Sequence, residues 1–183
     1  MKQTEQQLIK LNLACGERTY SDYINIDKFH KTADIIMDLE NYPWDIDSNY
    51  AEEILAQHFL EHVADINSFL KEIFRILKPN GILHIFVPHY SYGFTHPFHV
   101  RGFSLGFMNF IDHYVPEVDF ELIEPVKLNY TRSSNFVLRC LKYPINFIAN
   151  LHPQFCERIW CYWVGGFEEM EFKVKSLKNL NKE

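Results

Sequence analysis

The sequence predicts an α/β protein built on a mostly parallel sheet with helical crossovers. Three observations support this prediction. Short apolar runs end at small or acidic residues, the segment 65–77 has apolar residues at helical spacing, and a buried strand follows it after a Lys-Pro-Asn-Gly turn. Strands that alternate with helices over short distances favour parallel pairing, because each crossover returns the chain to the same edge of the sheet.

Each element expected before Pro88 has its own local signal. The first four expected strands end at a Gly-containing turn, at Asp27, at Asp38 and just before Gln57, and the fifth follows the turn at 78–81. The expected strands are 9–13, 23–26, 33–37, 53–56 and 82–87, and the expected helix is 65–77.

The pattern changes after Pro88, where aromatic residues become frequent. We expect a loop rich in His, Tyr and Phe at 89–101, a helix at 104–114, strands at 120–130 and 171–177, and between these strands a helical, aromatic-rich insertion at 135–162. Two late strands on either side of an insertion favour an antiparallel edge of the sheet. A second independent core is not evident, so the whole chain, 1–183, is predicted to be a single domain.

Composition excludes several classes of protein. The 183 residues are 47% hydrophobic and 23% charged, which is typical of a globular chain and not of a disordered one. The net charge of −6 argues against a nucleic-acid binder, whose affinity depends on phosphate neutralisation. Four cysteines without CxxC spacing, together with an N-terminus lacking an apolar signal segment, predict a reducing, cytoplasmic location. The unusual quantity is the 16% of aromatic residues.

The first candidate site follows the first expected strand. Ala14, Cys15 and Gly16 form a turn of small residues that lets a ligand approach the backbone, and Asp27 ends the second strand, where it can accept two ribose hydroxyls. Asp27 lies only eleven residues after Gly16, which leaves no room for a full helix. This spacing argues against a dinucleotide and for a nucleoside ligand without a pyrophosphate. A tight turn beside a surface Asp is the alternative interpretation.

Five segments taken together are more specific. The sequence resembles the class I S-adenosylmethionine-dependent methyltransferases, in particular a compact bacterial type with a shortened first crossover, over about residues 9–101. The segments that carry the resemblance are Leu11-Asn12-Leu13-Ala14-Cys15-Gly16, Asn25-Ile26-Asp27, Met37-Asp38-Leu39, the run from Ile54 to His62, and the run from Phe69 to Leu83 with its LKPNG turn.

The resemblance implies a three-layer Rossmann-like methyltransferase sheet, with the cofactor-binding core at 9–101 and an acceptor-side half at 102–183. It also implies S-adenosylmethionine as the cofactor. The cofactor-binding residues it implies are Asn12, Ala14, Cys15, Gly16, Asp27, Asp38, Leu39, Gln57 and His58. The family usually has an acidic residue where Asn12 stands and Gly where Ala14 stands. These two departures support an alternative, a methyltransferase-like module that binds a nucleoside or a partner without catalysis.

The aromatic and His-rich loop at 89–101 follows the fifth strand, at the edge of the sheet where ligands of open α/β folds bind. A His of near-neutral pKa can remove a proton from a hydroxyl or amine acceptor. The candidate catalytic residues are therefore His89, His96 and His99, and the candidate substrate-binding residues are His62, Tyr92 and Arg101. A hydrogen-bonded loop and a metal site made by the three candidate catalytic His are alternatives, and no metal is predicted.

A rival pattern is present at His58-Phe59-Leu60-Glu61-His62, which fits the H-x-x-E-H signature of zinc hydrolases. That chemistry requires both His on one face of a helix. We expect Glu61 and His62 to lie at the start of a helix after the fourth strand. His62 is then either a substrate contact or a structural residue with a hydrogen-bonded imidazole.

The expected function is methyl transfer to an O or N atom of a small-molecule or saccharide acceptor. The insertion at 135–162 is interpreted as core packing, as a lid, or as a dimer or membrane-surface contact. Its aromatic residues favour a flat or apolar pocket beside the methyl donor. The expected partners are a small-molecule substrate and a possible homodimer, with no nucleic acid and no stable membrane insertion.

Overall fold

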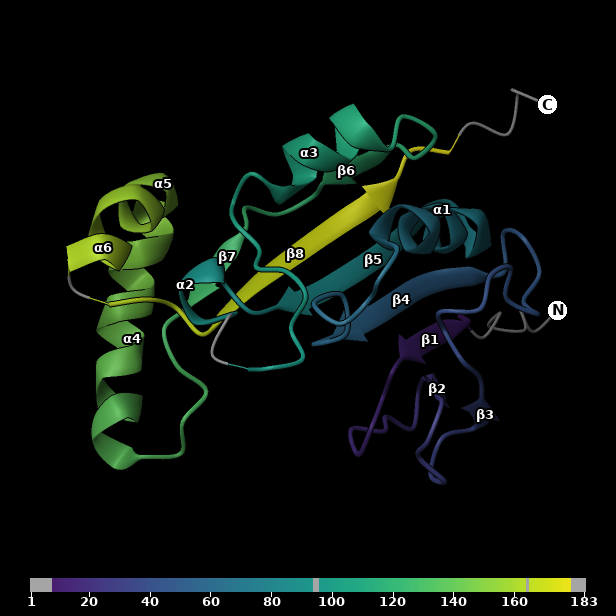
Figure 1. Cartoon of the computed structure of the whole chain (residues 1–183), viewed down its shortest axis with the longest axis horizontal. Helices are drawn as coiled ribbons and strands as arrows, with labels where there is room; N and C mark the ends of the chain where they lie inside the picture. Colours follow the sequence, from purple (N-terminus) through teal and green to yellow (C-terminus); the bar gives the residue numbers. More distant parts are fainter. Residues whose placement is uncertain (1–7, 94–95, 164, 179–183) are drawn as a thin grey trace, which may run out of the picture.

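The computed structural model describes residues 8–93, 96–163 and 165–178, and its described strands form one eight-stranded sheet (Figure 1). The strand order is β3-β2-β1-β4-β5-β8-β6, and β7 also pairs with β8. Strands β1 to β5 pair in parallel, whereas β8 runs antiparallel to β5, β6 and β7. The strands are β1 (Lys10–Leu13), β2 (Ile24–Asp27), β3 (Ile35–Ile36), β4 (Ala51–Gln57), β5 (Leu77–Val87), β6 (Phe120–Leu122), β7 (Lys127–Asn129) and β8 (Glu169–Ser176).

This topology confirms the predicted Rossmann-like α/β sheet with an antiparallel edge. Two details differ from the expectation. The strand expected at 120–130 is divided into β6 and β7, and Pro125 between them has no N–H to donate to a strand ladder. The turn expected at 78–81 is a bulge within β5, in which Asn80 has a φ of 62° and a Cβ on Gly81 would lie 2.8 Å from the Lys78 carbonyl oxygen.

Helices form where the sequence carries caps or apolar stripes. α1 begins after Asp65, whose side chain accepts hydrogen bonds from the backbone N–H groups of Asn67 and Ser68. The helices are α1 (Ile66–Ile76), α2 (Tyr90–Gly93), α3 (Phe107–Tyr114), α4 (Phe136–Leu151), α5 (Pro153–Phe155) and α6 (Cys161–Trp163), with a π-helical turn at Cys156–Trp160 between the last two. None of the helices described in the structure is long and apolar enough to cross a membrane.

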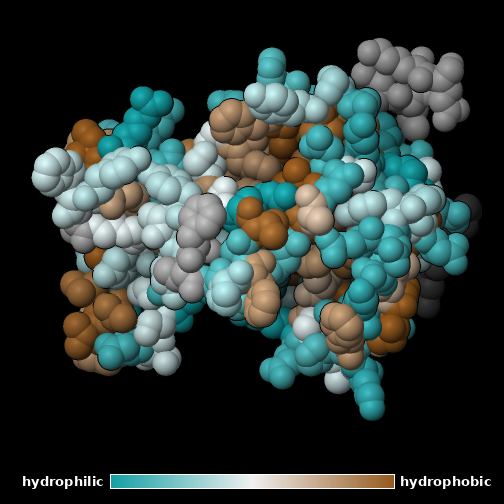
Figure 2. All heavy atoms as spheres, in the orientation of Figure 1, coloured by the Kyte–Doolittle hydropathy of each residue, from teal (hydrophilic) through white to brown (hydrophobic). Residues whose placement is uncertain are grey.

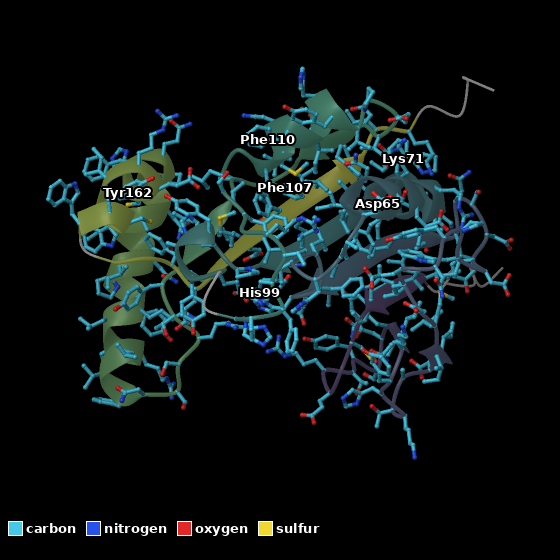
Figure 3. The ribbon with its side chains drawn as sticks, in the orientation of Figure 1. Asp65, Lys71, His99, Phe107, Phe110 and Tyr162 are labelled. Carbon is cyan, nitrogen blue, oxygen red and sulfur yellow. The ribbon has the colours of Figure 1, made fainter. Side chains whose placement is uncertain are left out.

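The apolar core lies between one face of the sheet and the helices α1 and α3 (Figure 1). The rings of Phe107 and Phe172 join α3 to β8 with centroids 5.6 Å apart, and Trp44 from the loop before β4 packs edge-on against Phe69 of α1. Figure 3 shows Phe107 at the junction of α3 and β8. Burial of these large side chains is the main source of the fold's stability.

The opposite face of the sheet is polar where β5 and β8 cross it. His84 Nε2 lies 3.0 Å from Glu171 Oε1, and Lys173 Nζ lies 3.2 Å from Glu124 Oε1. The described segment 14–23 between β1 and β2 has no helix, as its short length predicts. No crossover helix therefore covers the sheet between β1 and β2 in this described segment.

The insertion is anchored to the sheet edge by two asparagines of α4. Asn150 Oδ1 accepts a hydrogen bond of 2.7 Å from the backbone N–H of Leu128, and Asn146 Oδ1 accepts one of 2.8 Å from Tyr130. These amides supply the partners that a further strand would give to the edge of β7. The outer surface of α4 is apolar and exposed, and Figure 2 shows its lower part as a hydrophobic patch at the left.

Buried Glu72 predicts an acid-sensitive fold. Burial alone would raise the pKa of its carboxyl, but Arg75 and the backbone N–H of Trp44 outweigh this effect, so the pKa is below its ordinary value. The stability that Glu72 contributes is then present above the unfolded-state pKa of about 4.3 and is lost as the pH falls through the lower folded-state pKa. We expect Glu72→Gln to cost about 1–3 kcal/mol at pH 7. Urea unfolding should show that the free energy of unfolding falls less between pH 7 and pH 3 in the variant than in the wild type. Equal decreases would contradict this role of Glu72.

Candidate cofactor and acceptor site

Two cavities lie at the carboxyl ends of the parallel strands. The larger pocket has a volume of about 710 Å³ and the smaller pocket about 390 Å³, and His62 lines both of them. The larger pocket is lined by Cys15, Gly16, Glu17, Arg18, Gln57, His58, Glu61, His62, Pro88, Tyr92, His96, His99 and Arg132. The smaller pocket is lined by Ala14, Asp27, Lys28, Phe29, Met37, Asp38, Leu39, Glu40, Phe59 and His62.

The end of β2 places a charged carboxylate in the smaller pocket. Asp27 Oδ2 accepts a hydrogen bond of 3.0 Å from the Gly16 N–H, and Oδ1 accepts from the N–H groups of Phe29 and His30 at 2.8 and 2.9 Å. Burial alone would raise the pKa of Asp27, but these three donors outweigh it and hold the pKa below its ordinary value. Asp27 therefore presents an ionised acceptor beside the first turn.

The remaining wall of the smaller pocket combines one ion pair with apolar side chains. Asp38 accepts a hydrogen bond of 2.5 Å from Lys28 Nζ, while Leu39 is buried and Phe59 faces the same cavity. A carboxylate at one end of an apolar slot is the combination that a nucleoside requires, with hydroxyls at one end and a flat base at the other.

The turn after β1 has a left-handed backbone. Ala14 has a φ of 51° and Gly16 a φ of 52°. Asn12, within β1, is buried and lines neither pocket. Its Nδ2 donates to the Arg18 carbonyl at 2.7 Å and to Asn25 Oδ1 at 3.0 Å. Asn12 therefore fixes the short first crossover. The structure supports a positioning role for this residue.

Ala14→Gly is expected to leave stability unchanged or to raise it by up to about 1 kcal/mol. The left-handed conformation costs an L residue about 1–2 kcal/mol, and the greater chain entropy of Gly offsets about 0.5–1 kcal/mol of that gain. Ala51→Gly within β4 is the matched control and should be destabilising, because Ala51 has no positive φ. Thermal unfolding of both variants checks the prediction, and an equal loss in both would contradict it.

The end of β4 places His58 in the larger pocket. Its backbone φ is 54°, and its Nε2 lies 2.7 Å from both Glu169 Oε2 and Arg132 Nη1. Burial alone would lower the pKa of His58, and Arg132 acts in the same direction, but Glu169 and Glu61 outweigh both and raise the pKa. Strained backbone of this kind is concentrated at functional sites. Neighbouring Gln57 accepts a hydrogen bond from the Tyr20 hydroxyl at 3.2 Å.

Three His side chains meet at the mouth of the larger pocket. The rings of His96 and His99 stack with centroids 4.7 Å apart, and the ring of His62 lies 4.9 Å from that of His99. Figure 3 shows His99 on the loop between α2 and α3, with other nitrogen-bearing side chains beside it. Tyr92 of α2 lines the same pocket. The structure thus gathers four of the predicted substrate and catalytic residues.

Two predicted residues do not reach this pocket. His89 is fully buried, and its Nδ1 lies 2.7 Å from Ser91 Oγ, so it is removed from the candidate bases. Arg101 is directed away from the pocket, where its guanidinium donates to the carbonyls of Leu60 at 2.9 Å and Ala64 at 3.2 Å. In both cases, the side chain that was predicted to act on the substrate instead contacts polar groups of the protein itself.

The geometry also removes the zinc-hydrolase alternative. Residues 58–62 form a bend and a turn, and the helix that was expected to begin with Glu61 and His62 begins only at Ile66. The two His of the H-x-x-E-H pattern therefore do not share a helix face. His58 is also engaged with Glu169 and Arg132.

Several lining residues were missed in the sequence. Glu61 belongs to the LEH run, so its position at the end of β4 was a signal. For Arg18, the only signal in the sequence was its position just after the turn at Gly16. Arg132, which lines the larger pocket, and Glu169, which contacts His58, come from distant segments that the antiparallel edge folds back towards β4, and no local pattern identifies them.

The expected flat or apolar pocket beside the methyl donor involves only part of the insertion, because Leu138, Ile145 and Trp160 line a cavity of about 280 Å³ that shares Tyr92 with the larger pocket. Phe136, Tyr143, Phe147 and Tyr162 are more than two-thirds exposed, and none of them lines either pocket. The larger pocket is instead lined by Arg, Glu and His side chains. These four aromatic side chains of the insertion therefore belong to an exposed surface and not to the two pockets.

Comparison with known proteins agrees with this geometry. Residues 11–85 match the family model described as "Methyltransferase domain". Similar solved structures include a SAM-dependent methyltransferase from Archaeoglobus fulgidus, with 15% identity, a TM-score of 0.57, and coverage of 92% of this chain and 86% of that one. No curated protein matches the sequence.

Two further structures have the same fold. An S-adenosylmethionine-dependent methyltransferase from Mesorhizobium loti has 12% identity, a TM-score of 0.54, and coverage of 92% of this chain and 90% of that one. Phosphoethanolamine N-methyltransferase 2 from Haemonchus contortus, in complex with S-adenosyl-L-methionine, has 13% identity, a TM-score of 0.52, and coverage of 93% and 49%. Residues 11–85 are thus similar to a methyltransferase domain, and the chain shares its fold with these S-adenosylmethionine-dependent methyltransferases.

Proposed function

We propose that the protein transfers a methyl group from S-adenosylmethionine to an O or N atom of a small polar acceptor, such as a saccharide. The observation that carries the proposal is the pairing of two pockets that meet at His62. One has the carboxylate of Asp27 beside an apolar slot, and the other has a charged and imidazole-rich lining.

The residues around the smaller pocket fit the nucleoside part of the cofactor. Asp27 would accept the ribose hydroxyls, Asp38 would meet the edge of the adenine, and Leu39 and Phe59 would flank its faces. The turn of Ala14, Cys15 and Gly16 would pass under the methionine part, with Gln57 and His58 beside it. The fit is supported by the pocket linings, since Ala14 lines the smaller pocket whereas Cys15 and Gly16 line the larger.

The larger pocket fits a polar acceptor. When bound, S-adenosylmethionine supplies an electrophilic methyl group. The protein's task is then to align the acceptor atom and to remove its proton. His96 is exposed at this pocket and is our candidate for the base, while Arg18 and Arg132 supply positive charge for an acidic group of the acceptor. His62 and Tyr92 are proposed to contact the acceptor.

A non-catalytic binding module is the second candidate function. Ala14 adds a methyl group, at a φ of 51°, to the turn under the cofactor, and Asn12 replaces a carboxylate. A module of this kind would bind S-adenosylhomocysteine and S-adenosylmethionine but would never convert one into the other.

Formation of S-adenosylhomocysteine separates these two functions. The purified chain is incubated with S-adenosylmethionine and a panel of saccharides, acidic saccharides and small amines. An acceptor-dependent product with a mass increase of one methyl group is expected. Cofactor binding without any acceptor-dependent turnover would favour the module.

We also propose a homodimer formed through the exposed apolar surface of α4, which includes Tyr143 and Phe147. Light scattering after size exclusion should give about twice the chain mass of 21.9 kDa. Phe147→Asp should give the monomer mass, because a buried charge opposes association. A monomeric wild type would contradict the proposal. The four free thiols favour a cytoplasmic location, which cell fractionation tests.

A further inference from the structure

The larger pocket contains a buried carboxylate without a hydrogen bond. Glu61 is 1% exposed, and within the described residues neither of its carboxylate oxygens accepts a hydrogen bond. Its nearest cationic candidates are His58 Nδ1 at 3.4 Å and His99 Nε2 at 3.9 Å from Oε1. Burial of a carboxylate costs several kcal/mol unless a cation or a set of donors compensates it. Glu61 therefore has imidazoles nearby but no hydrogen-bond donor on either carboxylate oxygen within the described residues, which leaves both oxygens available to a cation.

Two imidazoles face the same point as this carboxylate. The ligand atoms of Glu61, His62 and His99 all lie within 4.8 Å of one another. Bonds of about 2.0–2.2 Å in tetrahedral geometry place ligand atoms about 3.3–3.6 Å apart, so a small movement of these side chains would bring all three atoms to a shared ion. Two imidazole nitrogens and one carboxylate suit a divalent transition metal and not Mg²⁺ or Ca²⁺, which prefer oxygen ligands.

The tautomer of His62 is set for metal binding. Its Nδ1 lies 3.1 Å from the carbonyl oxygen of Phe98, and a carbonyl oxygen only accepts, so Nδ1 must donate. In the neutral ring this leaves Nε2 with a free lone pair. A backbone carbonyl that holds the second ring nitrogen in this way is the usual support of a metal-binding His.

The two segments that carry the cluster are joined by backbone contacts. The N–H of Val100 donates to the Glu61 carbonyl at 2.9 Å, and Arg101 donates to the carbonyls of Leu60 and Ala64. The turn after β4 and the loop after α2 are thus held together before any ligand binds. Arg101, which points away from the pocket, therefore helps to hold these two segments together.

We propose that Glu61, His62 and His99 form a binding site for one divalent transition-metal ion such as Zn²⁺ or Co²⁺. Three protein ligands leave coordination positions for water or for an oxygen atom of the acceptor. Binding of an acceptor oxygen to the metal rests on the proposed methyl transfer. The set differs from the H-x-x-E-H pattern, because His58 is engaged by Glu169 and Arg132 while His99 comes from another loop.

Direct metal binding tests the site without any assay of activity. The metal-free full-length chain is titrated with Zn²⁺ by calorimetry, and with Co²⁺ while visible absorption is recorded. We expect one ion per chain and a visible Co²⁺ absorption band of the kind that four-coordinate nitrogen and oxygen ligation gives. Glu61→Gln and His99→Ala should each weaken Zn²⁺ binding at least about 100-fold. His113→Ala, on the exposed side of α3, is the matched control and should bind as the wild type does.

The outcomes are distinguishable from those of the proposed function. Absence of stoichiometric Zn²⁺ binding by the folded wild type, or wild-type affinity in Glu61→Gln, would overturn the site, and the nearby imidazoles of His58 and His99 would then be the partners of Glu61. Circular dichroism confirms that each variant is folded. Failure to bind S-adenosylmethionine would overturn the methyltransferase proposal but leave the metal result standing.

Discussion

Replacing Asp27 with Ala is expected to lower the affinity for S-adenosylmethionine by about 10²–10⁴-fold. A carboxylate that accepts two ribose hydroxyls makes two charge-assisted hydrogen bonds, each worth about 1.5–3 kcal/mol, and 1.4 kcal/mol corresponds to a tenfold change. Asp27 is already ionised and held by the N–H groups of Gly16, Phe29 and His30, so its geometry requires no rearrangement. Calorimetric titration of wild type and variant measures the effect.

Two controls accompany this variant. Asp27→Asn keeps the side-chain shape but loses the charge and one acceptor, so its affinity should be intermediate. Asp22→Asn lies outside the two pockets, and its affinity should not change. An Asp27→Ala protein that is folded and binds the cofactor as tightly as the wild type would place the ribose elsewhere.

Replacing His96 with Ala is expected to reduce turnover by about 10²–10⁴-fold while leaving cofactor affinity intact, because a positioned base contributes that much to proton removal. His96 lines the larger pocket only, away from Asp27, so the two variants should separate binding from catalysis. Single-turnover methyl transfer with the acceptor found in the panel gives the rate, and calorimetry gives the affinity.

The pH profile distinguishes a base from a structural residue. Loss of a base should remove the lower limb of the wild-type profile, whereas a structural role would lower the rate equally at every pH. His96→Gln, which keeps hydrogen bonding but cannot take the proton, should be as slow as His96→Ala. Normal turnover in both variants would show that the base is elsewhere or unnecessary.

The parallel half of the fold was largely predictable. Strands β1, β2, β4 and β5 carry apolar runs that end at recognisable turns, and α1 has both an apolar stripe and the N-cap Asp65. Local sequence determines such elements. The second half was harder to predict, because Pro125 divides one expected strand and because α4 is held by Asn146 and Asn150, whose partners on β7 are set by tertiary packing.

The candidate site was predictable where it follows the strand ends. Gly16, Asp27 and Gln57 each stand directly after or at the end of a strand, so chain order alone brings them to one edge. The direction of a side chain in a loop was not predictable, and His89 and Arg101 turned away from the pocket for this reason. Composition does not say which face of a helix is buried, so the sequence could not separate Trp160, which lines a cavity next to Tyr92, from exposed rings such as Phe147.

We expect S-adenosylmethionine to bind in the two pockets that meet at His62. The most direct test of this expectation is a calorimetric titration of the folded wild type with S-adenosylmethionine and S-adenosylhomocysteine. We predict saturable binding of both at one molecule per chain, with each ligand preventing the binding of the other. The absence of binding for both ligands to a folded sample would contradict the account.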